Sequence, residues 1–155
     1  MAAGIHELRE RVRCDIVAAA LGPKMCRLAG AEADGVLLNW LTPRFARTAI
    51  SWIREGADSA GRRGPRIMAY VRTALGEDAR QRLEVEAGRY GQIPAYAAHF
   101  RRMGVSGMET AVTGRTGEEI DRGLAAWNGI VDEVVVRAIT AGDSVEELRE
   151  LLAAV

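Results

Sequence analysis

The feature that most constrains this chain is a repeated alternation of short apolar runs with helical segments that open on strong start signals. The four apolar runs lie at about 16–21, 36–38, 67–75 and 131–136. Continuous apolar runs are typical of strands buried on both faces, and strands that return through helices pair in parallel. The sequence therefore predicts an α/β fold with right-handed crossovers around one parallel sheet.

The start signals of the helices are specific. Pro23 and Pro43 stand at first helical positions, where the missing proline N–H has no helical partner, and Thr42 precedes the second as an N-cap. Capping boxes at 116–119 and 144–147 open the last two helices. The buried face expected of the last helix consists of Val145, Leu148, Leu152 and Val155.

The length of 155 residues predicts a single domain. We expect a leader segment at 1–12, two βα units and a third strand at 13–76, a helical insertion at 77–115 and a final helix–strand–helix unit at 116–155. The insertion should break near Gly91, and its glycine-rich end should be a loop. Four strands fit a small open sheet or half of a closed barrel, and periodicity does not separate these alternatives.

The composition excludes several classes of partner. Acidic and basic residues balance at 21 each, so no net charge favours nucleic acid or an anionic membrane. No apolar run approaches the roughly 18 residues that span a bilayer, and the N-terminus lacks a signal peptide. Cys14 and Cys26 match no disulfide or metal-ligand spacing. We therefore expect a cytoplasmic protein, and the near-absence of lysine among the bases is typical of a GC-rich bacterium.

The strongest candidate site lies where the first strand ends, at Leu21 to Met25. Binding loops of parallel α/β folds lie at the carboxyl ends of the strands. Gly22 lets a ligand approach the backbone, and the amides of Lys24 and Met25 lie at the positive end of a helix dipole. This combination suits a phosphate. Gly22-Pro23 is equally compatible with a plain turn that starts a helix.

Three other positions have competing interpretations. Asp34 precedes a strand, on the face opposite the candidate site, and is interpreted as structural. His99 is interpreted as a surface or packing histidine, because the sequence shows no partner or cleft for a general acid or base. Arg137 ends the last strand and is compatible with a phosphate or carboxylate ligand, and equally with an ion pair to Asp132 or Glu133.

Three stretches of the chain resemble the luciferase-like monooxygenase family, which comprises flavin- and deazaflavin-dependent oxidoreductases on a (β/α)8 barrel. The stretches are AALGPKMCRLAG at 19–30, ADGVLLN at 33–39 and VDEVVVR at 131–137. The closer match is to the actinobacterial branch that uses the deazaflavin coenzyme F-420, in which Tyr90 and Pro94-Ala-Tyr96 also find counterparts. The resemblance extends over about residues 12–155.

The resemblance implies that the four strands are the fifth to eighth of a TIM barrel. The chain would then be a parallel (β/α) half-barrel, with the helical insertion after its third strand lying over the cofactor. The first four βα units, which in this family supply part of the ring cradle and most substrate contacts, have no counterpart in the sequence. The implied function is a family oxidoreductase fragment that binds the phosphate end of FMN or coenzyme F-420, and no catalytic residue is identified.

The resemblance also assigns roles to the candidate residues. Gly22 and its neighbours would hold the cofactor phosphate. Asn39 would hydrogen-bond the flavin ring edge or a ribityl hydroxyl, while Trp40 would line the ring pocket or, as favoured here, pack as a plug. Arg101 and Arg102 are interpreted as a solvated face, or as partners of the acidic tail of the deazaflavin coenzyme.

Two further hypotheses stay open. One is a non-catalytic half-barrel or assembly module without turnover, and the other is an unrelated small α/β binding domain. Beside the cofactor and a small-molecule substrate, we expect a homodimer or a complementing N-terminal half as the partner. The reason is that the runs at 16–21 and 131–136 would be apolar edge strands, which invite pairing with another chain.

Overall fold

The computed structural model describes residues 2–153, which form seven α-helices around one parallel sheet. The strands are β1 (Val17–Ala20), β2 (Gly35–Asn39), β3 (Arg66–Leu75), β4 (Val112–Gly114) and β5 (Glu133–Ile139). The helices are α1 (Ala2–Arg11), α2 (Pro23–Glu32), α3 (Pro43–Ser59), α4 (Glu77–Gly91), α5 (Pro94–Met103), α6 (Gly117–Ala125) and α7 (Val145–Ala153). The predicted α/β class and parallel pairing are confirmed. No helix within these residues is long and apolar enough to cross a bilayer.

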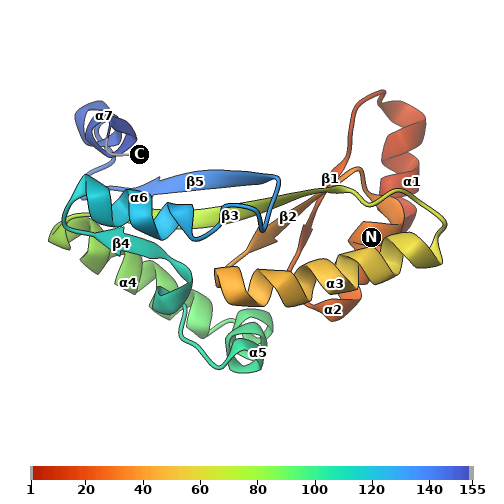
Figure 1. Cartoon of the computed structure of the whole chain (residues 1–155), viewed down its shortest axis with the longest axis horizontal. Helices are drawn as coiled ribbons and strands as arrows, with labels where there is room; N and C mark the ends of the chain where they lie inside the picture. The colour runs from red at the N-terminus through yellow and green to blue at the C-terminus, as the bar shows by residue number, and fades with distance from the viewer. Residues whose placement is uncertain (1, 154–155) are drawn as a thin grey trace.

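Strand β3 is the centre of the sheet, because it is paired along both edges. Its residues 66–70 pair with β2, and residues 73–75 pair with β4. Strand β5 pairs with residues 68–74, so it must run along the opposite edge from both β2 and β4 (Figure 1). Strand β1 pairs with β2. As a result, β3 and β5 continue beyond the point at which β2 ends.

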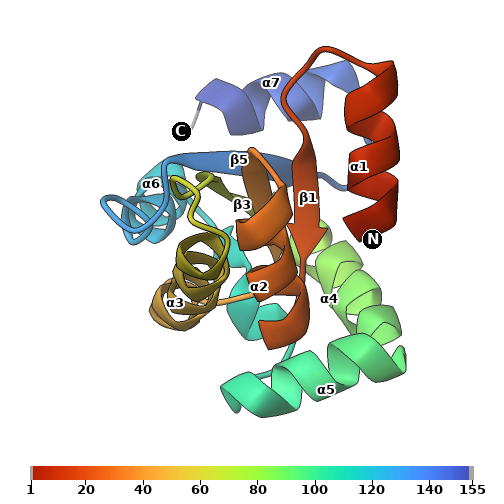
Figure 2. The same cartoon turned by 90° about the vertical axis from the view of Figure 1, so that its right-hand side faces the viewer.

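The side chains of the strands alternate between two differently covered faces. The first face is buried under α2, α3 and α6, whereas α4 lies on the other side of the sheet (Figure 2). Buried residues of the first face are Ala18, Val36, Leu38, Ala69 and Val71. On the second face α4 and α5 bury Ala74 and Ile139 at the carboxyl end, but Val17 near the amino end is 50% exposed.

The local start signals behave as predicted. Thr42 Oγ1 accepts a hydrogen bond from Phe45 N at 3.2 Å, and Thr116 Oγ1 accepts one from Glu119 N at 3.3 Å. Ser144 and Glu147 form a reciprocal capping box. The insertion breaks where expected, because α4 ends at Gly91 and α5 begins at Pro94.

Other expectations need correction. The leader segment is the helix α1, whose Ile5 is buried and whose Arg9 donates to Asp34. The glycine-rich loop contains a 3-10 turn, Met108–Thr110, and the short strand β4. The last strand spans 133–139 rather than 131–136, because Asp132 ends the preceding turn by accepting a hydrogen bond from Ile67 N.

The face of α7 was also predicted incorrectly. Leu151 is its buried residue, while Val145 and Leu152 are exposed and Leu148 is half-buried. Val155 lies outside the described residues. The surface of α7 that is buried against the rest of the chain is therefore smaller than its apolar residues predicted.

Two glycines determine how closely α2 and α3 approach each other. A methyl group on Gly30 would lie 2.0 Å from the carbonyl oxygen of Ile53, and one on Gly56 would lie 1.9 Å from that of Arg27. Each glycine therefore packs directly against the backbone of the other helix. Because backbone cannot move aside as a flexible side chain can, any larger residue must push the helices apart.

We predict that Gly30→Ala and Gly56→Ala each lower the free energy of unfolding by at least about 2 kcal/mol, because both overpack a backbone contact. Gly88→Ala is the matched control. A methyl group there meets nothing within 4 Å, so the control should raise stability by about 0.5–1 kcal/mol through helix propensity alone. Urea unfolding followed by circular dichroism measures all three, and equal stabilities would contradict the close crossing.

Candidate functional site

The carboxyl ends of β1, β2, β3 and β5 converge beneath the α4–α5 segment, and we call this region the mouth. Asn39 and Trp40 end β2, Arg72 lies near the end of β3, and Arg137 is its register partner on β5. Gly22 follows the end of β1. The mouth is where ligands bind in parallel α/β folds.

The predicted phosphate loop begins helix α2. Gly22 is the N-cap, in an extended conformation with φ −139°, and makes no side-chain cap; Pro23 is the first helical residue. Leu21 and Pro23 are half-buried, while Lys24 and Met25 are exposed. The Gly22 carbonyl accepts the hydrogen bond of Cys26 N at 2.9 Å, so the helix starts regularly. The amides that precede Cys26 lie at the positive end of the helix.

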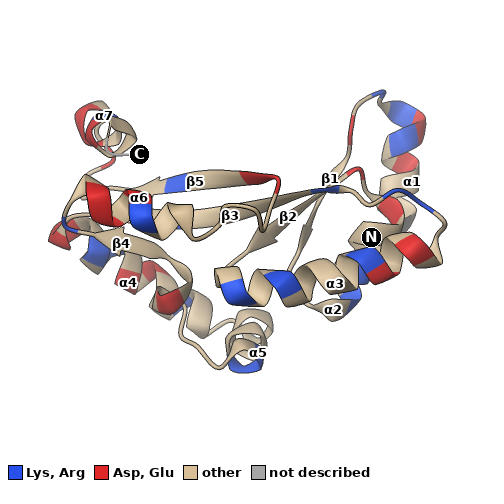
Figure 3. Ribbon diagram, in the orientation of Figure 1, with Lys and Arg blue, Asp and Glu red and all other residues tan. Residues whose placement is uncertain are grey.

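The guanidinium of Arg102 lies beside this helix start, a position that the sequence did not predict. A methyl group on Gly22 would be 3.6 Å from Nη1 of Arg102, which comes from α5. Helix α5 carries only basic charges, whereas most other helices mix both signs (Figure 3). Among residues 2–153 no ion pair neutralises Arg102. The two residues are 80 positions apart in the sequence, so no local pattern indicated their proximity.

Trp40 lies in the middle of the mouth, with the left-handed backbone conformation (φ +52°) that bulky residues rarely adopt. Its side chain is 1% exposed and packs against Tyr90 and Phe100, with ring centroids 4.8 and 5.7 Å away. This burial fits the packing role that the sequence favoured for Trp40. Its Nε1 is buried and has no hydrogen-bond partner within the described chain.

Arg72 is a buried charge at the same place, only 4% exposed. Its guanidinium lies 3.6 Å from the centre of the Trp40 ring, and Nη1 donates to Asn39 Oδ1 at 2.7 Å. Its Nε donates to Glu86 Oε1 at 2.6 Å, and Arg137 Nη2 donates to the other oxygen of that carboxylate at 2.9 Å. Arg137 therefore pairs with Glu86 of α4 and not with Asp132 or Glu133.

Glu86 is held in its ionised form by this arrangement. Burial by itself raises the pKa of the Glu86 carboxyl, but the hydrogen bonds from Arg137 and Arg72 outweigh burial and leave that pKa lowered. Sequence reasoning missed this cluster; the signal that could have found it is Arg72, the one charged residue in the predicted run at 67–75. The partner, Glu86, is one of 21 acidic residues, and no feature of the sequence distinguishes it from the others.

His99 supports Trp40 from α5. It is 3% exposed, and its Nε2 donates to the carbonyl oxygen of Trp40 at 2.8 Å, which leaves Nδ1 buried without a partner among the described residues. Burial lowers the pKa of the imidazole, and the nearby positive charge of Arg102 lowers it further, against the opposing effect of the Trp40 carbonyl. His99 is a packing histidine that holds the strained residue at the end of β2.

We predict that the free energy of unfolding falls as the pH drops below about 6.5, where unfolded histidine takes up a proton and the folded His99 resists it. Because the pKa of His99 is lower in the folded than in the unfolded protein, its neutral form contributes to the free energy of unfolding. This contribution is complete at a pH above the pKa of the unfolded state and is lost as the pH falls toward the pKa of the folded state. His99→Gln should lack this contribution.

Urea unfolding between about pH 8 and about pH 5.5 checks this, because carboxylates common to both proteins cancel in the difference between wild type and His99→Gln. That difference should shrink as the pH falls. A difference that stays constant with pH would contradict the assignment.

At the amino ends of the strands, Asp34 is structural, as predicted. Its carboxylate accepts hydrogen bonds from Arg9 at 2.7 Å, from Ile16 N at 3.0 Å and from Arg62 at 3.2 Å. The Arg9 hydrogen bond, followed by that of Ile16 N, lowers the pKa of the Asp34 carboxyl. This residue ties α1, β1 and the loop after α3 together.

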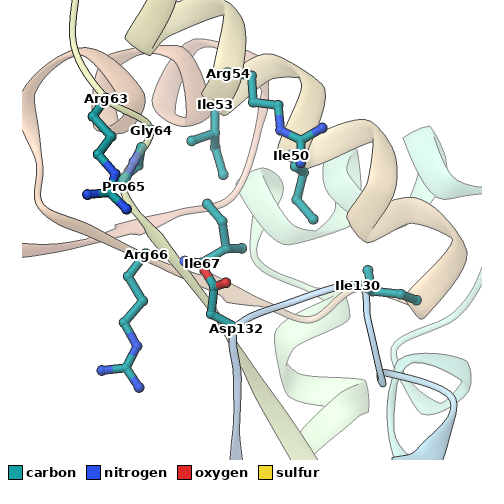
Figure 4. A pocket seen from close by; sticks show the side chains of 10 residues that line it. All are labelled: Ile50, Ile53, Arg54, Arg63, Gly64, Pro65, Arg66, Ile67, Ile130 and Asp132. Carbon is teal, nitrogen blue, oxygen red and sulfur yellow. Dashed lines mark hydrogen bonds between the residues drawn. The ribbon is translucent and has the colours of Figure 1, made fainter.

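A hollow of about 630 Å3 also lies at the amino ends, beside α3 (Figure 4). Buried isoleucines form its floor, and the guanidinium of Arg66 points away from them (Figure 4). The carboxylate of Asp132 accepts the hydrogen bond of Ile67 N at 2.7 Å and is therefore occupied. Residues at this end of a parallel fold serve stability, so the mouth is the candidate site.

Comparison with known proteins identifies the family and the fold. The model of the family described as luciferase-like monooxygenase matches residues 6–155. A 5,10-methylenetetrahydromethanopterin reductase of Methanopyrus kandleri is 32% identical over 147 residues, which are 87% of this chain and 40% of the reductase.

Solved structures give the same fold. An F-420-dependent secondary alcohol dehydrogenase, in complex with an F-420–acetone adduct, superimposes with a TM-score of 0.68 at 15% identity, covering 92% of this chain and 49% of that one. The coenzyme F-420-dependent tetrahydromethanopterin reductase of Methanopyrus kandleri gives a TM-score of 0.57 at 19% identity, covering 90% and 49%. The chain thus spans about half the length of these structures, and less than half of the curated reductase.

Proposed function

Because the chain belongs to the luciferase-like monooxygenase family, we propose that it binds the phosphate end of coenzyme F-420 or FMN at the loop from Leu21 to Met25. The observation that carries the proposal is the meeting of three features at Gly22: a strand end, a helix N-terminus and the guanidinium of Arg102. Backbone amides at the positive end of a helix, with a cation beside them, suit a phosphate.

The residues at the mouth fit the rest of such a cofactor. Asn39 Oδ1 accepts from Arg72, so its amide NH2 is the group left to donate to a ring edge or a hydroxyl. Tyr90, which is half-buried, packs against the buried Trp40 ring next to it. Once bound, the cofactor supplies the hydride chemistry, whereas the protein binds and orients it and excludes water.

We expect Gly22→Val and Arg102→Gln each to weaken binding of FMN and of coenzyme F-420 at least tenfold, about 1.4 kcal/mol. The valine blocks close approach to the backbone, and the glutamine removes the neighbouring charge. Quenching of flavin or deazaflavin fluorescence measures the affinity. Arg101→Gln, one residue away on α5, is the matched control and should bind FMN, which has no acidic tail, as wild type does. Wild-type affinity in both folded test variants would overturn the loop assignment.

A second proposal is that this chain is one half of a (β/α)8 barrel, with its strands in the positions of barrel strands five to eight. The side-by-side order β1-β2-β3-β5, the coverage of about half of the matched structures, and the exposed amino end of the second face support it. Another half-barrel would cover that face. A half-barrel that assembles in this way without catalysing a reaction, the non-catalytic assembly module, stays open as an alternative.

Sedimentation at micromolar concentration tests this second proposal. We expect a dimer or larger species, because Val17 on the edge strand β1 is 50% exposed and its strand has one unpaired edge. Val17→Lys should shift the population toward the monomer, since a charge on an edge strand opposes pairing. A compact wild-type monomer at those concentrations would contradict it.

A further inference from the structure

We propose that Arg72 and Arg137 form a binding site for the carboxylate of a small molecule that enters the mouth, and that Glu86 occupies this site as an internal ligand which the incoming carboxylate replaces. The site lies on β3 and β5, away from the phosphate loop that follows β1. Because a carboxylate can bind here without a cofactor, this site and the proposed phosphate loop can be tested separately.

The balance of charge favours an anionic ligand. Arg72 and Arg137 are register partners on adjacent parallel strands, and like charges at such positions repel each other. One carboxylate, that of Glu86, is shared between the two guanidinium groups. The cluster therefore keeps one positive charge in excess, at a place where Arg72 is 4% exposed and solvent screens little.

The geometry matches a carboxylate. Oε1 of Glu86 accepts from Arg72 Nε at 2.6 Å, and Oε2 accepts from Arg137 Nη2 at 2.9 Å. The two guanidinium groups are thus spaced so that one planar carboxylate bridges them, with one charge-assisted hydrogen bond to each. Glu86 belongs to α4 rather than to the sheet, so its departure requires no change in the strands.

A second observation is a buried donor next to Arg72 without a partner in the described part of the chain. The indole Nε1 of Trp40 is a buried donor with no partner within residues 2–153. It belongs to the ring on which the Arg72 guanidinium stacks, at 3.6 Å from the ring centre. A buried donor without a hydrogen-bond acceptor destabilises the folded state by about 1–3 kcal/mol, and an acceptor atom of a ligand would remove this penalty.

The site is accessible from the second face of the sheet. The side chain of Arg137 is 39% exposed, whereas that of Arg72 is closed in by Trp40 and Glu86. Tyr70, two residues before Arg72 on the same face, is half-buried and lies beside the site, with its ring centroid 5.5 Å from the Arg72 guanidinium. A ligand would approach Arg137 first and then displace Glu86.

Acetate is the test probe, titrated into the full chain at constant ionic strength and followed by the indole N–H resonance of Trp40. The resonance is identified by elimination with Trp52→Phe and Trp127→Phe. Glu86→Gln should bind acetate at least tenfold more tightly than wild type, because the competing internal carboxylate is gone. Adding Arg137→Gln to that variant should abolish the gain. Glu84→Gln, an exposed glutamate on the same helix, is the matched control and should behave as wild type.

The result that would overturn the proposal is equal acetate affinity in wild type, Glu86→Gln and the double variant, which would make the arginines a structural ion pair. The Tm gives a second readout, since acetate should stabilise Glu86→Gln more than chloride at the same ionic strength. If Glu86→Gln is unfolded in chloride, acetate should restore its folded signal. Failure of acetate to restore it would equally count against a carboxylate site.

Discussion

The geometry of the mouth depends on one buried charge, the guanidinium of Arg72. Burying an ion costs several kcal/mol unless partners compensate it, and the partners of Arg72 come from two other parts of the fold. Asn39 and Trp40 bring the end of β2 to it, and Glu86 brings α4. Trp40 keeps a left-handed conformation that costs about 1–3 kcal/mol, because the Arg72 stack and the His99 hydrogen bond hold it there.

The elements were predictable because their determinants are local. Thr42 at an N-cap, the Thr116 and Ser144 capping boxes and the prolines at the starts of α2 and α3 act within one helical turn, and each forms as its spacing predicts. The same holds for Asp34, whose place before a strand marks the structural end of a parallel sheet. Fold class follows from such signals, since alternating strands and helices leave few arrangements.

The site was predictable only in part, because its chemistry comes from contacts between distant segments. The loop at Gly22 was proposed from its own residues, but the cation beside it, Arg102, comes from the insertion. Arg72 was missed, although it is the one charge in the predicted run at 67–75, and its partner is one glutamate among many on a helix with no unusual sequence. Strand β4 was missed for a similar reason, since three residues make no periodic pattern and need β3 to pair with.

The strand order gives the two proposed anion sites a fixed relation. Strand β2 lies between β1, which leads into the Gly22 loop, and β3, which carries Arg72. Asn39 and Trp40, at the end of β2, therefore separate the phosphate loop from the arginine pair. A flat cofactor anchored by its phosphate at Gly22 would extend toward Asn39 and Trp40. A carboxylate held by Arg137 would then reach the same residues from the opposite side. Two ligands arranged in this way meet over β2, which is the geometry that transfer between a cofactor and a second molecule requires.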